Sequence, residues 1–375
     1  MGELIPQELY RFAYFIVAFF LTISITASGE PLREEPEKAT FDKSLLLGVF
    51  YIIFFGTRPT SGIWMTDTEG YVNVYRLIQS TDFSNFAISD HELAWHWLCD
   101  TMSKAGFEPW IWLSVVAAIY ILFNIWGTKL IFPHHVYLVF LFYTVFFLFY
   151  SGGTNGIRNA DAYSIVFFAM ALFNHLEGKW KYVIIAALCW IGYQFHTSVI
   201  VTILSFALSV FIVKKTKTAL YIWVAAIGLS LAAGNFLANI ASGYIDDGRA
   251  SKYLMYAENN NMMAGFSHTG FRWDFLLFSS LPILLGWYVT VKRNVQDKFF
   301  QILLNTYIIA NAVWIVFIYA AFSNRFAMLS WCIYPYVFCY PLIKFELWEY
   351  KVQNRYMTYA LWIMLIFSGY MNVFI

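Results

Sequence analysis

Long apolar runs dominate the sequence, and YLVFLFYTVFFLFY at residues 137–150 is a clear example. A helix needs about 20 apolar residues to cross the roughly 30 Å hydrocarbon core of a bilayer. By that measure twelve runs are candidate spans, several of them short, and they lie near residues 8–27, 44–57, 109–127, 135–151, 160–174, 181–194, 197–213, 218–237, 273–291, 299–321, 326–343 and 355–373. The pattern predicts an all-α, polytopic integral membrane protein with about twelve transmembrane helices, formed as a single domain over residues 1–375.

The composition supports this fold class and excludes several others. Hydrophobic residues make up 60% of the chain and charged residues only 13%, whereas a soluble domain carries about 25% charged residues. The formal net charge of +1 provides no strongly basic face of the kind that binds nucleic acid. We therefore expect the lipid bilayer as the surroundings of the chain and no nucleic-acid partner.

Residues 181–213 leave two topologies open, because they offer only about 33 residues for two crossings. Either two short helices cross the membrane here, or the segment forms a re-entrant hairpin, which is tolerated where the backbone is buried in protein. The hairpin would place the central GYQFHTS, residues 192–198, at membrane depth.

Lysine and arginine are distributed unevenly between the two predicted faces. Cations near span ends favour the cytoplasm, and placing residues 28–43 inside gives twelve lysines and three arginines inside, against two lysines and seven arginines outside. Because a planar guanidinium suits bidentate recognition of phosphate or carboxylate, we expect the outer face to bind an anionic ligand. The alternative is that the outer arginines extend to the interface or pair with acidic residues of the same face, namely Asp67, Glu69, Asp246 and Asp247.

Two long segments fall on the outer side, residues 58–108 and 238–272. The first contains HELAWHWLCDTMSKAGF, which predicts an amphipathic helix lying along the interface. The apolar face of that helix would be formed by Leu93, Trp97, Leu98 and Met102. The second segment is polar and rich in glycine and asparagine, and it is long enough to act as a lid.

The stretch SGGTNGIRNADAYS at residues 151–164 interrupts two strongly apolar runs. Its glycines allow a sharp turn, and Asn155 can cap a helix that begins near Arg158. A helix N-terminus presents free N–H groups and a positive dipole end, to which an arginine adds charge, so the stretch predicts a phosphate site. The alternative is a capped outer turn in which Arg158 bonds Asp161 at i, i+3.

Other candidate residues are isolated along the chain. His196 lies in FHTS, where a histidine near membrane depth is costly unless it is paired, and imidazole suits proton exchange near neutral pH. A hydrogen-bonded structural histidine is the alternative. Arg325 opens a late span within SNRF, and Arg249 and Arg272 are further outer cations.

The sequence does not favour a metal or nucleotide enzyme. Asp67 and Glu69 can ligate a divalent metal, but the same spacing occurs in any polar loop, and the four cysteines lack metal-binding spacing. We find no GxSxG elbow, HExxH, Walker-A loop or Rossmann fingerprint between strand and helix. We therefore expect no metal and no cofactor, and a lipid-carried anionic substrate rather than a soluble nucleotide.

The ordered set of short motifs resembles the EpsG-like, Wzy-type family of polysaccharide polymerases over about residues 44 to 343. The motifs are a D-x-x-x-Y segment, an acidic residue before an amphipathic stretch, a G-x-R helix start, FH-x-S about forty residues later and a late NRF. They correspond to Asp67 and Tyr71, Glu92, Gly156 and Arg158, His196 and Ser198, and Arg325. The sequence departs from the family at Asn159, where the family often has glutamine.

The resemblance implies a multi-pass glycosyltransferase of the GT-C type in the bacterial inner membrane, with its active site on the periplasmic side. Such an enzyme, in O-antigen, lipopolysaccharide or other surface-polysaccharide biosynthesis, would transfer a growing glycan from undecaprenyl diphosphate to the non-reducing-end sugar of an incoming lipid-linked repeat unit. A polysaccharide chain-length regulator is an expected partner. The repeat-unit sugars and the linkage do not follow from the resemblance.

The site residues expected from this assignment fall into two groups. The catalytic group stabilises the diphosphate and handles the acceptor proton, with His196 as base or orienting group and an acidic residue as the alternative base; its members are Arg158, His196, Arg325, Asp67 and Glu69. The substrate-binding group completes the diphosphate site, holds acceptor hydroxyls or stacks on sugar rings; its members are Arg249, Arg272, Tyr71, Tyr75, Glu92, Asn155, Ser198 and Tyr253. Trp95 and Trp97 are further stacking candidates, although an interfacial aromatic belt also explains such residues.

Other functions are also compatible with the sequence. A flippase or transporter of the same lipid-linked substrate would also need arginines, but in a central cavity and often with two related halves, and we find no such repeat. An O-antigen ligase would share the donor and use lipid A core as acceptor. A membrane acyltransferase would be expected to show a stronger His/Asp pattern.

Overall fold

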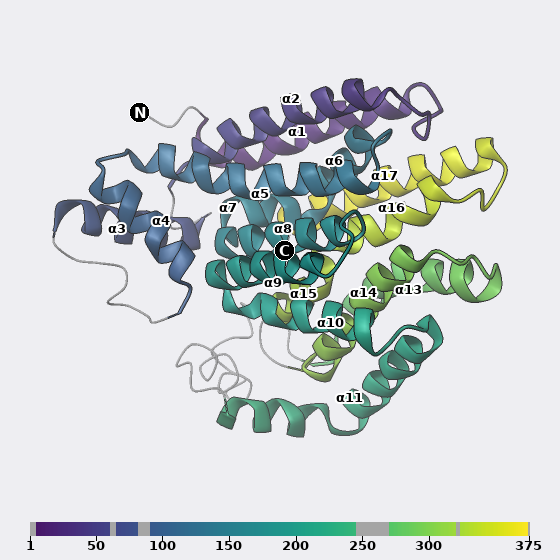
Figure 1. Ribbon diagram of the computed structural model, residues 1–375. Helices are drawn as coiled ribbons and strands as arrows, with labels where there is room; N and C mark the ends of the chain where they lie inside the picture. Colours follow the sequence, from purple (N-terminus) through teal and green to yellow (C-terminus); the bar gives the residue numbers. More distant parts are fainter. Residues whose placement is uncertain (1–4, 61–64, 82–90, 245–269, 320–322, 374–375) are drawn as a thin grey trace. The chain divides into compact units, whose positions relative to one another are not determined.

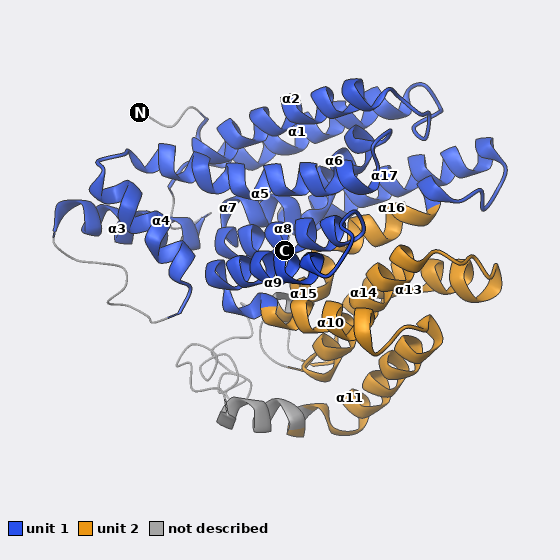
Figure 2. Ribbon diagram, viewed as in Figure 1, with its two compact units in different colours: residues 1–199, 342–375 blue, residues 200–341 orange. Residues whose placement is uncertain are grey.

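The structure is a computed structural model that describes residues 5–60, 65–81, 91–244, 270–319 and 323–373 (Figure 1). Every regular element in these ranges is helical, which confirms the expected all-α class. The chain divides into two compact units, residues 1–199 with 342–375 and residues 200–341 (Figure 2).

Unit 1, residues 1–199 with 342–375, is built around four helices that pack in series. Helix α2 packs on α5, α5 on α8, and α8 on α9, while α17 packs on α1, α6 and α7. Tyr14, Tyr51, Phe55 and Phe149 are all buried in its aromatic core. The helices are α1 (Gln7–Thr26), α2 (Glu37–Gly56), α3 (Thr66–Ser80), α4 (Leu93–Lys104), α5 (Pro109–Ile131), α6 (Val136–Val145), α7 (Phe147–Thr154), α8 (Ile157–Phe173), α9 (Trp180–Phe195), the 3₁₀ turn η2 (Thr197–Val199) and α17 (Tyr350–Val373).

The most apolar run, at residues 137–150, is not one straight helix. It breaks at Phe146, whose backbone is extended, so that α6 and α7 meet at an angle of 75°. Helix α7 then continues through Gly152 and Gly153, so the turn expected from the glycines does not lie at these two, and the break between α7 and α8 falls at Asn155 and Gly156. A Cβ on Gly153 would lie 2.4 Å from the ring of Phe55, so this glycine permits close packing of α7 on α2.

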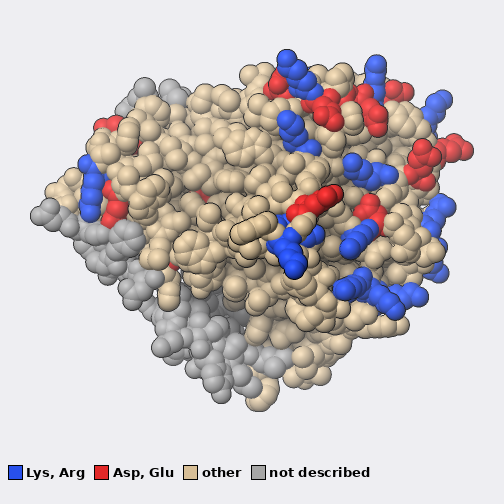
Figure 3. Space-filling view, viewed as in Figure 1, with Lys and Arg blue, Asp and Glu red and all other residues tan. Residues whose placement is uncertain are grey.

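Unit 1 has two chemically different ends. At one end Glu35 N–H donates to the carbonyl of His134, and His135 Nε2 contacts the carbonyl of Leu32. Figure 3 shows lysine, arginine, aspartate and glutamate side chains gathered around this end, where α1 connects to α2. At the other end lie the C-termini of α2, α7 and α9 and the N-terminus of α8. We call these the charged end and the site end.

Unit 2, residues 200–341, is centred on α14, which packs on α10, α11, α13 and α15. Polar side chains link its helices, because the indole of Trp223 donates to Asn311 Oδ1 at 2.8 Å and Asn311 donates to Ser330 at 3.1 Å. Its helices are α10 (Ile200–Phe211), α11 (Thr216–Tyr244), α13 (Trp273–Trp287), the π-helical turn η3 (Tyr288–Lys292), α14 (Lys298–Val316), α15 (Ser323–Trp331) and α16 (Tyr334–Lys344).

The described residues contain seven helices long and apolar enough to cross a membrane, or eight if the bent pair α6 and α7 forms one span. This confirms a polytopic membrane protein, but not a count of twelve. The runs near 160–174 and 181–194 form helices of 17 and 16 residues. After α9, His196 is extended and a 3₁₀ turn leads into the 12-residue α10, so both topologies predicted for residues 181–213 remain open.

The two long outer segments are described to different extents. Residues 58–108 contain helices α3 and α4, and α4 is the helix predicted from HELAWHWLCDTMSKAGF. It exposes Leu93 and Trp97 but buries Leu98, so only part of the expected apolar face is available to an interface. Most of the second segment, residues 245–269, lies outside the described residues.

Candidate functional site

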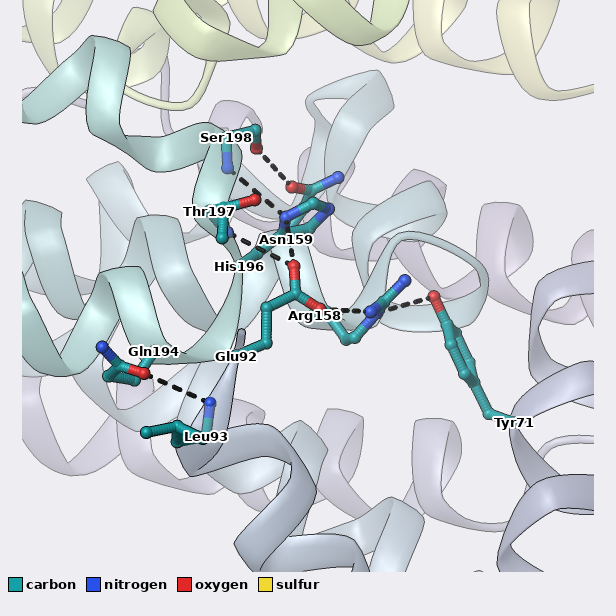
Figure 4. A network of polar contacts seen from close by, with 9 residues as sticks. All are labelled: Tyr71, Glu92, Leu93, Arg158, Asn159, Gln194, His196, Thr197 and Ser198. Atoms are coloured by element: carbon teal, nitrogen blue, oxygen red, sulfur yellow. Dashed lines mark hydrogen bonds and ion pairs between the residues drawn. The ribbon is translucent and has the colours of Figure 1, made fainter. Parts of the chain in front are cut away.

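Four charged or polar side chains from separate helices meet at the site end of unit 1. Tyr71 comes from α3, Glu92 from the start of α4, Arg158 from the first turn of α8 and His196 from the residue that ends α9. Figure 4 shows the carboxylate of Glu92 between the imidazole and the guanidinium, with Tyr71 on the far side of the guanidinium. The sequence predicted each of these four as a site residue, and the structure brings them together.

Arg158 is held from two sides. Its Nη1 forms an ion pair with Glu92 Oε2, and its Nε donates to the hydroxyl of Tyr71 at 3.1 Å. The guanidinium also lies 5.2 Å from the centre of the Tyr71 ring, within range of a cation–π interaction. The side chain is only 17% exposed, and Nη2 makes no hydrogen bond within the described part of the chain. Arg158 is therefore fixed in direction by partners from two other helices.

Glu92 is the centre of the cluster. Its backbone lies in the left-handed region, with φ 62° and ψ 44°, a conformation that costs a non-glycine residue about 1–2 kcal/mol. Its side chain is 11% exposed and accepts the Thr197 N–H at 3.3 Å in addition to its two side-chain partners. Burial raises the pKa of Glu92, but the opposing hydrogen bond from His196, the positive charges of His196 and Arg158 and the Thr197 N–H together lower it to about 2. The carboxylate is thus ionised at all physiological pH values.

The contact with Glu92 also sets the tautomer of His196. Nδ1 lies 2.9 Å from Glu92 Oε1, whereas the N–H of Ser198 is 3.4 Å from the same nitrogen. The shorter contact to a full negative charge is the stronger one, so Nδ1 carries a proton and donates it to Glu92. Nε2 makes no hydrogen bond within the described part of the chain, and in the neutral ring this nitrogen is a proton acceptor.

Two further polar contacts support the cluster, and the sequence did not single them out as site contacts. Ser198, a predicted site residue, donates from Oγ to Asn159 Oδ1 at 2.9 Å. Gln194 Oε1 accepts the N–H of Leu93 at 3.2 Å, which holds the first turn of α4 next to the end of α9. Asn159 stands where the resembled family often has glutamine, and Gln194 belongs to GYQFHTS, so both lay beside a recognised motif.

The local predictions for residues 151–164 are partly wrong. Asn155 does not cap α8, because the capping position is Gly156 and no side chain bonds the first turn. Arg158 does not bond Asp161, which is fully buried with no hydrogen bond to either carboxylate oxygen within the described residues. The helix start is instead fixed by tertiary contacts to Arg158, whose partners lie 66 and 87 residues away in the sequence.

Other predicted site residues of unit 1 lie outside this cluster. Asp67 and Glu69 are exposed in the first turn of α3. Tyr75 is 1% exposed, stacks on Trp112 and donates to the carbonyl of Phe107 at 2.9 Å, so it is a packing residue in this structure. Trp95 is also buried, against Tyr71 and Trp112, whereas Trp97 is 61% exposed.

The remaining predicted arginines belong to unit 2 or lie outside the described residues. Arg272 binds Asp274 through two hydrogen bonds of 2.9 and 2.6 Å, rather than an acidic residue predicted as a partner for the outer arginines. Arg325 lies in the first turn of α15, and its side chain is outside the described set. Arg249 and Tyr253 lie within residues 245–269, which are not described. In the residues that are described, no group of three or more His, Cys, Asp or Glu side chains is arranged to hold a metal.

The fold and this cluster define a class of protein: a polytopic, all-helical membrane protein with a half-buried polar site that offers a fixed guanidinium and an oriented imidazole. The chain belongs to the EpsG family, whose model matches residues 43–375. This membership confirms the resemblance seen in the motif order and indicates a polysaccharide polymerase-type function. Neither the curated proteins nor the solved structures gave a match to the chain.

Proposed function

We propose that this protein is a surface-polysaccharide polymerase of the O-antigen type, acting on undecaprenyl diphosphate-linked repeat units. One observation carries the proposal: a single ionised carboxylate, Glu92, bridges Arg158 and His196. The arrangement combines a group suited to a diphosphate with a group suited to a hydroxyl proton, which are the two requirements of glycan transfer from a lipid diphosphate. The family membership supports the same class of reaction.

In the proposed reaction the acceptor hydroxyl attacks the anomeric carbon of the donor glycan. The bond between that carbon and the diphosphate oxygen breaks, and its electron pair leaves on undecaprenyl diphosphate. Arg158, through its Nη2, which has no hydrogen-bond partner among the described residues, stabilises the charge that develops on the departing diphosphate. His196 Nε2 accepts the hydroxyl proton, and Glu92 stabilises the imidazolium that results.

The negative charge of Glu92 offsets the positive charge that Arg158 can offer to a diphosphate. With a neutral imidazole, the pair of Glu92 and Arg158 has no net charge, so a diphosphate needs further cations. We assign this role to Arg249 and Arg325, in keeping with the arginine-rich outer face. Arg272 would join them by exchanging its partner Asp274 for the diphosphate. Tyr253, in the same segment as Arg249, completes this substrate-binding group.

The acceptor side of the site is assigned to residues near the cluster. Asp67 and Glu69 would hold acceptor hydroxyls from the exposed first turn of α3, with either acting as an alternative base. Tyr71, Asn155 and Ser198 complete the polar surroundings, whereas burial makes Tyr75 a support for α3 rather than a sugar platform.

The proposal includes a membrane orientation. The charged end of unit 1 carries lysine-rich connections that favour the cytoplasm, so the site end would face the periplasm. A GT-C-like arrangement with about twelve spans, in which the shorter helices α8, α9 and α10 also contribute crossings, remains part of the proposal, as does a chain-length regulator as partner. The chain is proposed to act without a metal or other cofactor.

The decisive experiment supplies the purified protein with its lipid-linked repeat unit and compares acceptors. Elongation of the lipid-linked glycan, lost in Arg158→Ala with the protein still folded, supports a polymerase. Transfer only to lipid A core would identify a ligase. Transport of the lipid across proteoliposomes without any new glycosidic bond would identify a flippase, and either of these two results would overturn the proposal.

A further inference from the structure

The reaction described above makes no use of two charged residues buried beneath the site. Arg58, which follows α2, is 4% exposed, and Asp161, one turn after Arg158 on α8, is 0% exposed. No hydrogen bond joins the two side chains among the described residues. Burial lowers the pKa of Arg58 to about 10, so its guanidinium stays charged at neutral pH. An isolated buried charge is strongly unfavourable, so the placement of two such groups needs an explanation.

Arg58 ties together the ends of three helices. Its Nη1 donates to the carbonyl of Phe55 in the last turn of α2 at 2.6 Å, and its Nε donates to Thr68 Oγ1 in the first turn of α3 at 3.1 Å. The hydroxyl of Thr68 in turn donates to the carbonyl of Thr154, the last residue of α7. Carbonyls at helix C-termini lack intrahelical partners and attract positive charge, so a single guanidinium and a single hydroxyl satisfy two such ends.

These three helix ends lead directly to the candidate site. Thr68 and Tyr71 are three residues apart on α3 and therefore share a helix face. Thr154 is separated from Arg158 by only three residues, including the capping Gly156. The clamp made by Arg58 and Thr68 therefore fixes both sides of the hydrogen bond between Tyr71 and Arg158.

Asp161 lies in the same interior but does not take part in this clamp. Neither of its carboxylate oxygens has a hydrogen-bond partner among the described residues. The hydrogen bonds that join the helix ends therefore come from Arg58 and Thr68.

We propose that Arg58 is a positioning residue for the site, which holds α3 and α7 in the register that joins Tyr71 to Arg158. The consequence for turnover rests on the proposed polymerase function. The effect on how firmly α3 is attached is independent of that function, because it concerns only contacts within unit 1.

The test uses two variants of the full-length protein that separate charge from hydrogen-bond geometry. Arg58→Lys keeps the charge but lacks the forked donor pair that reaches Phe55 and Thr68. Arg58→Met combined with Asp161→Asn removes both buried ionisable groups and, with them, every hydrogen bond of the clamp that Arg58 donates. Arg76→Met is the matched control, because Arg76 is an exposed arginine of α3, the helix that the clamp is proposed to hold.

Hydrogen–deuterium exchange of residues 66–80 measures the clamp directly. We expect exchange in this segment to rise at least tenfold in both Arg58 variants, with thermal midpoints near that of the wild type and no change in Arg76→Met. In the elongation assay we expect both variants to lose roughly tenfold in kcat, since a guanidinium held by fewer contacts is less well oriented. Wild-type exchange in α3 together with wild-type kcat in the folded double variant would overturn the proposal. If the wild-type protein forms no elongated glycan, the polymerase assignment fails, while the exchange result still decides whether Arg58 is a clamp.

Discussion

Replacement of Glu92 by glutamine changes one atom type at the centre of the site and should disable it. The carboxylate accepts hydrogen bonds on both oxygens, from His196 on one side and Arg158 on the other. A glutamine amide has one accepting oxygen and one donating NH₂ group. If the NH₂ group faces Arg158, two donors oppose each other. If it faces His196, the imidazole keeps the contact only in the tautomer with the proton on Nε2, which can no longer accept a proton.

The magnitude follows from the electrostatics of the site. The pKa of Glu92 is lowered from 4.5 to about 2, which corresponds to about 3 kcal/mol in favour of the ionised carboxylate. Loss of a buried charge partner for Arg158 is expected to lower the free energy of unfolding by about 2–3 kcal/mol. Removal of the acid that orients a catalytic histidine lowers turnover by about 10²- to 10⁴-fold in comparable dyads.

The assay is elongation of the lipid-linked repeat unit by purified protein, with thermal melting in detergent as the check on folding. Glu108→Gln is the matched control, because Glu108 is an exposed glutamate of the same outer segment, and it should leave both quantities unchanged. A folded Glu92→Gln protein with wild-type kcat would refute the bridging role of Glu92 and, with it, the assignment of His196 as a base.

Four further outcomes are expected. Tyr71→Phe removes one hydrogen bond to a guanidinium and should reduce kcat about 5- to 10-fold in the elongation assay, with little change in the thermal midpoint; a wild-type rate would exclude Tyr71 from the site. Because the folded-state pKa of Glu92 is lowered, its stabilising contribution is fully present above about pH 4.5 and is lost as the pH falls towards 2, so thermal midpoints recorded over this range should fall more steeply for wild type than for Glu92→Gln. Gly153→Ala should lower the thermal midpoint through an overpacking cost of about 1–3 kcal/mol against Phe55, whereas Gly228→Ala, with nothing within 4 Å of the new Cβ, should be neutral or stabilising. EDTA should leave elongation unchanged, and activity lost in EDTA but restored by Mg²⁺ or Mn²⁺ would count against a metal-free mechanism.

The sequence predicted the helical membrane class and several site residues, but not how those residues interact. Hydropathy is a property of local windows, so it located the apolar runs. The 75° break at Phe146 could not be predicted in this way, because no proline or glycine marks it in the sequence. Likewise the glycines of residues 151–164 look like a turn, although Gly153 lies within a helix against Phe55. Steric fit between distant residues decides both features.

The same reasoning applies to the site. The motif order identified Arg158, His196 and Glu92 as site residues. That Glu92 is the partner of both others depends on how α4, α8 and α9 pack. The nearer acid, Asp161, lies one turn from Arg158 and was the obvious local partner, yet the structure buries it on the side of Arg58. Local spacing therefore identified the right residue types and the wrong pair.

The most direct test of the central claim measures glycan elongation and free undecaprenyl diphosphate together, with purified protein and an authentic lipid-linked repeat unit. The account predicts a ladder of longer lipid-linked glycans with one undecaprenyl diphosphate released for each repeat unit added, and loss of both products in Arg158→Ala while the protein stays folded. Intact repeat units that cross a proteoliposome membrane, with no ladder and no released undecaprenyl diphosphate, would contradict it.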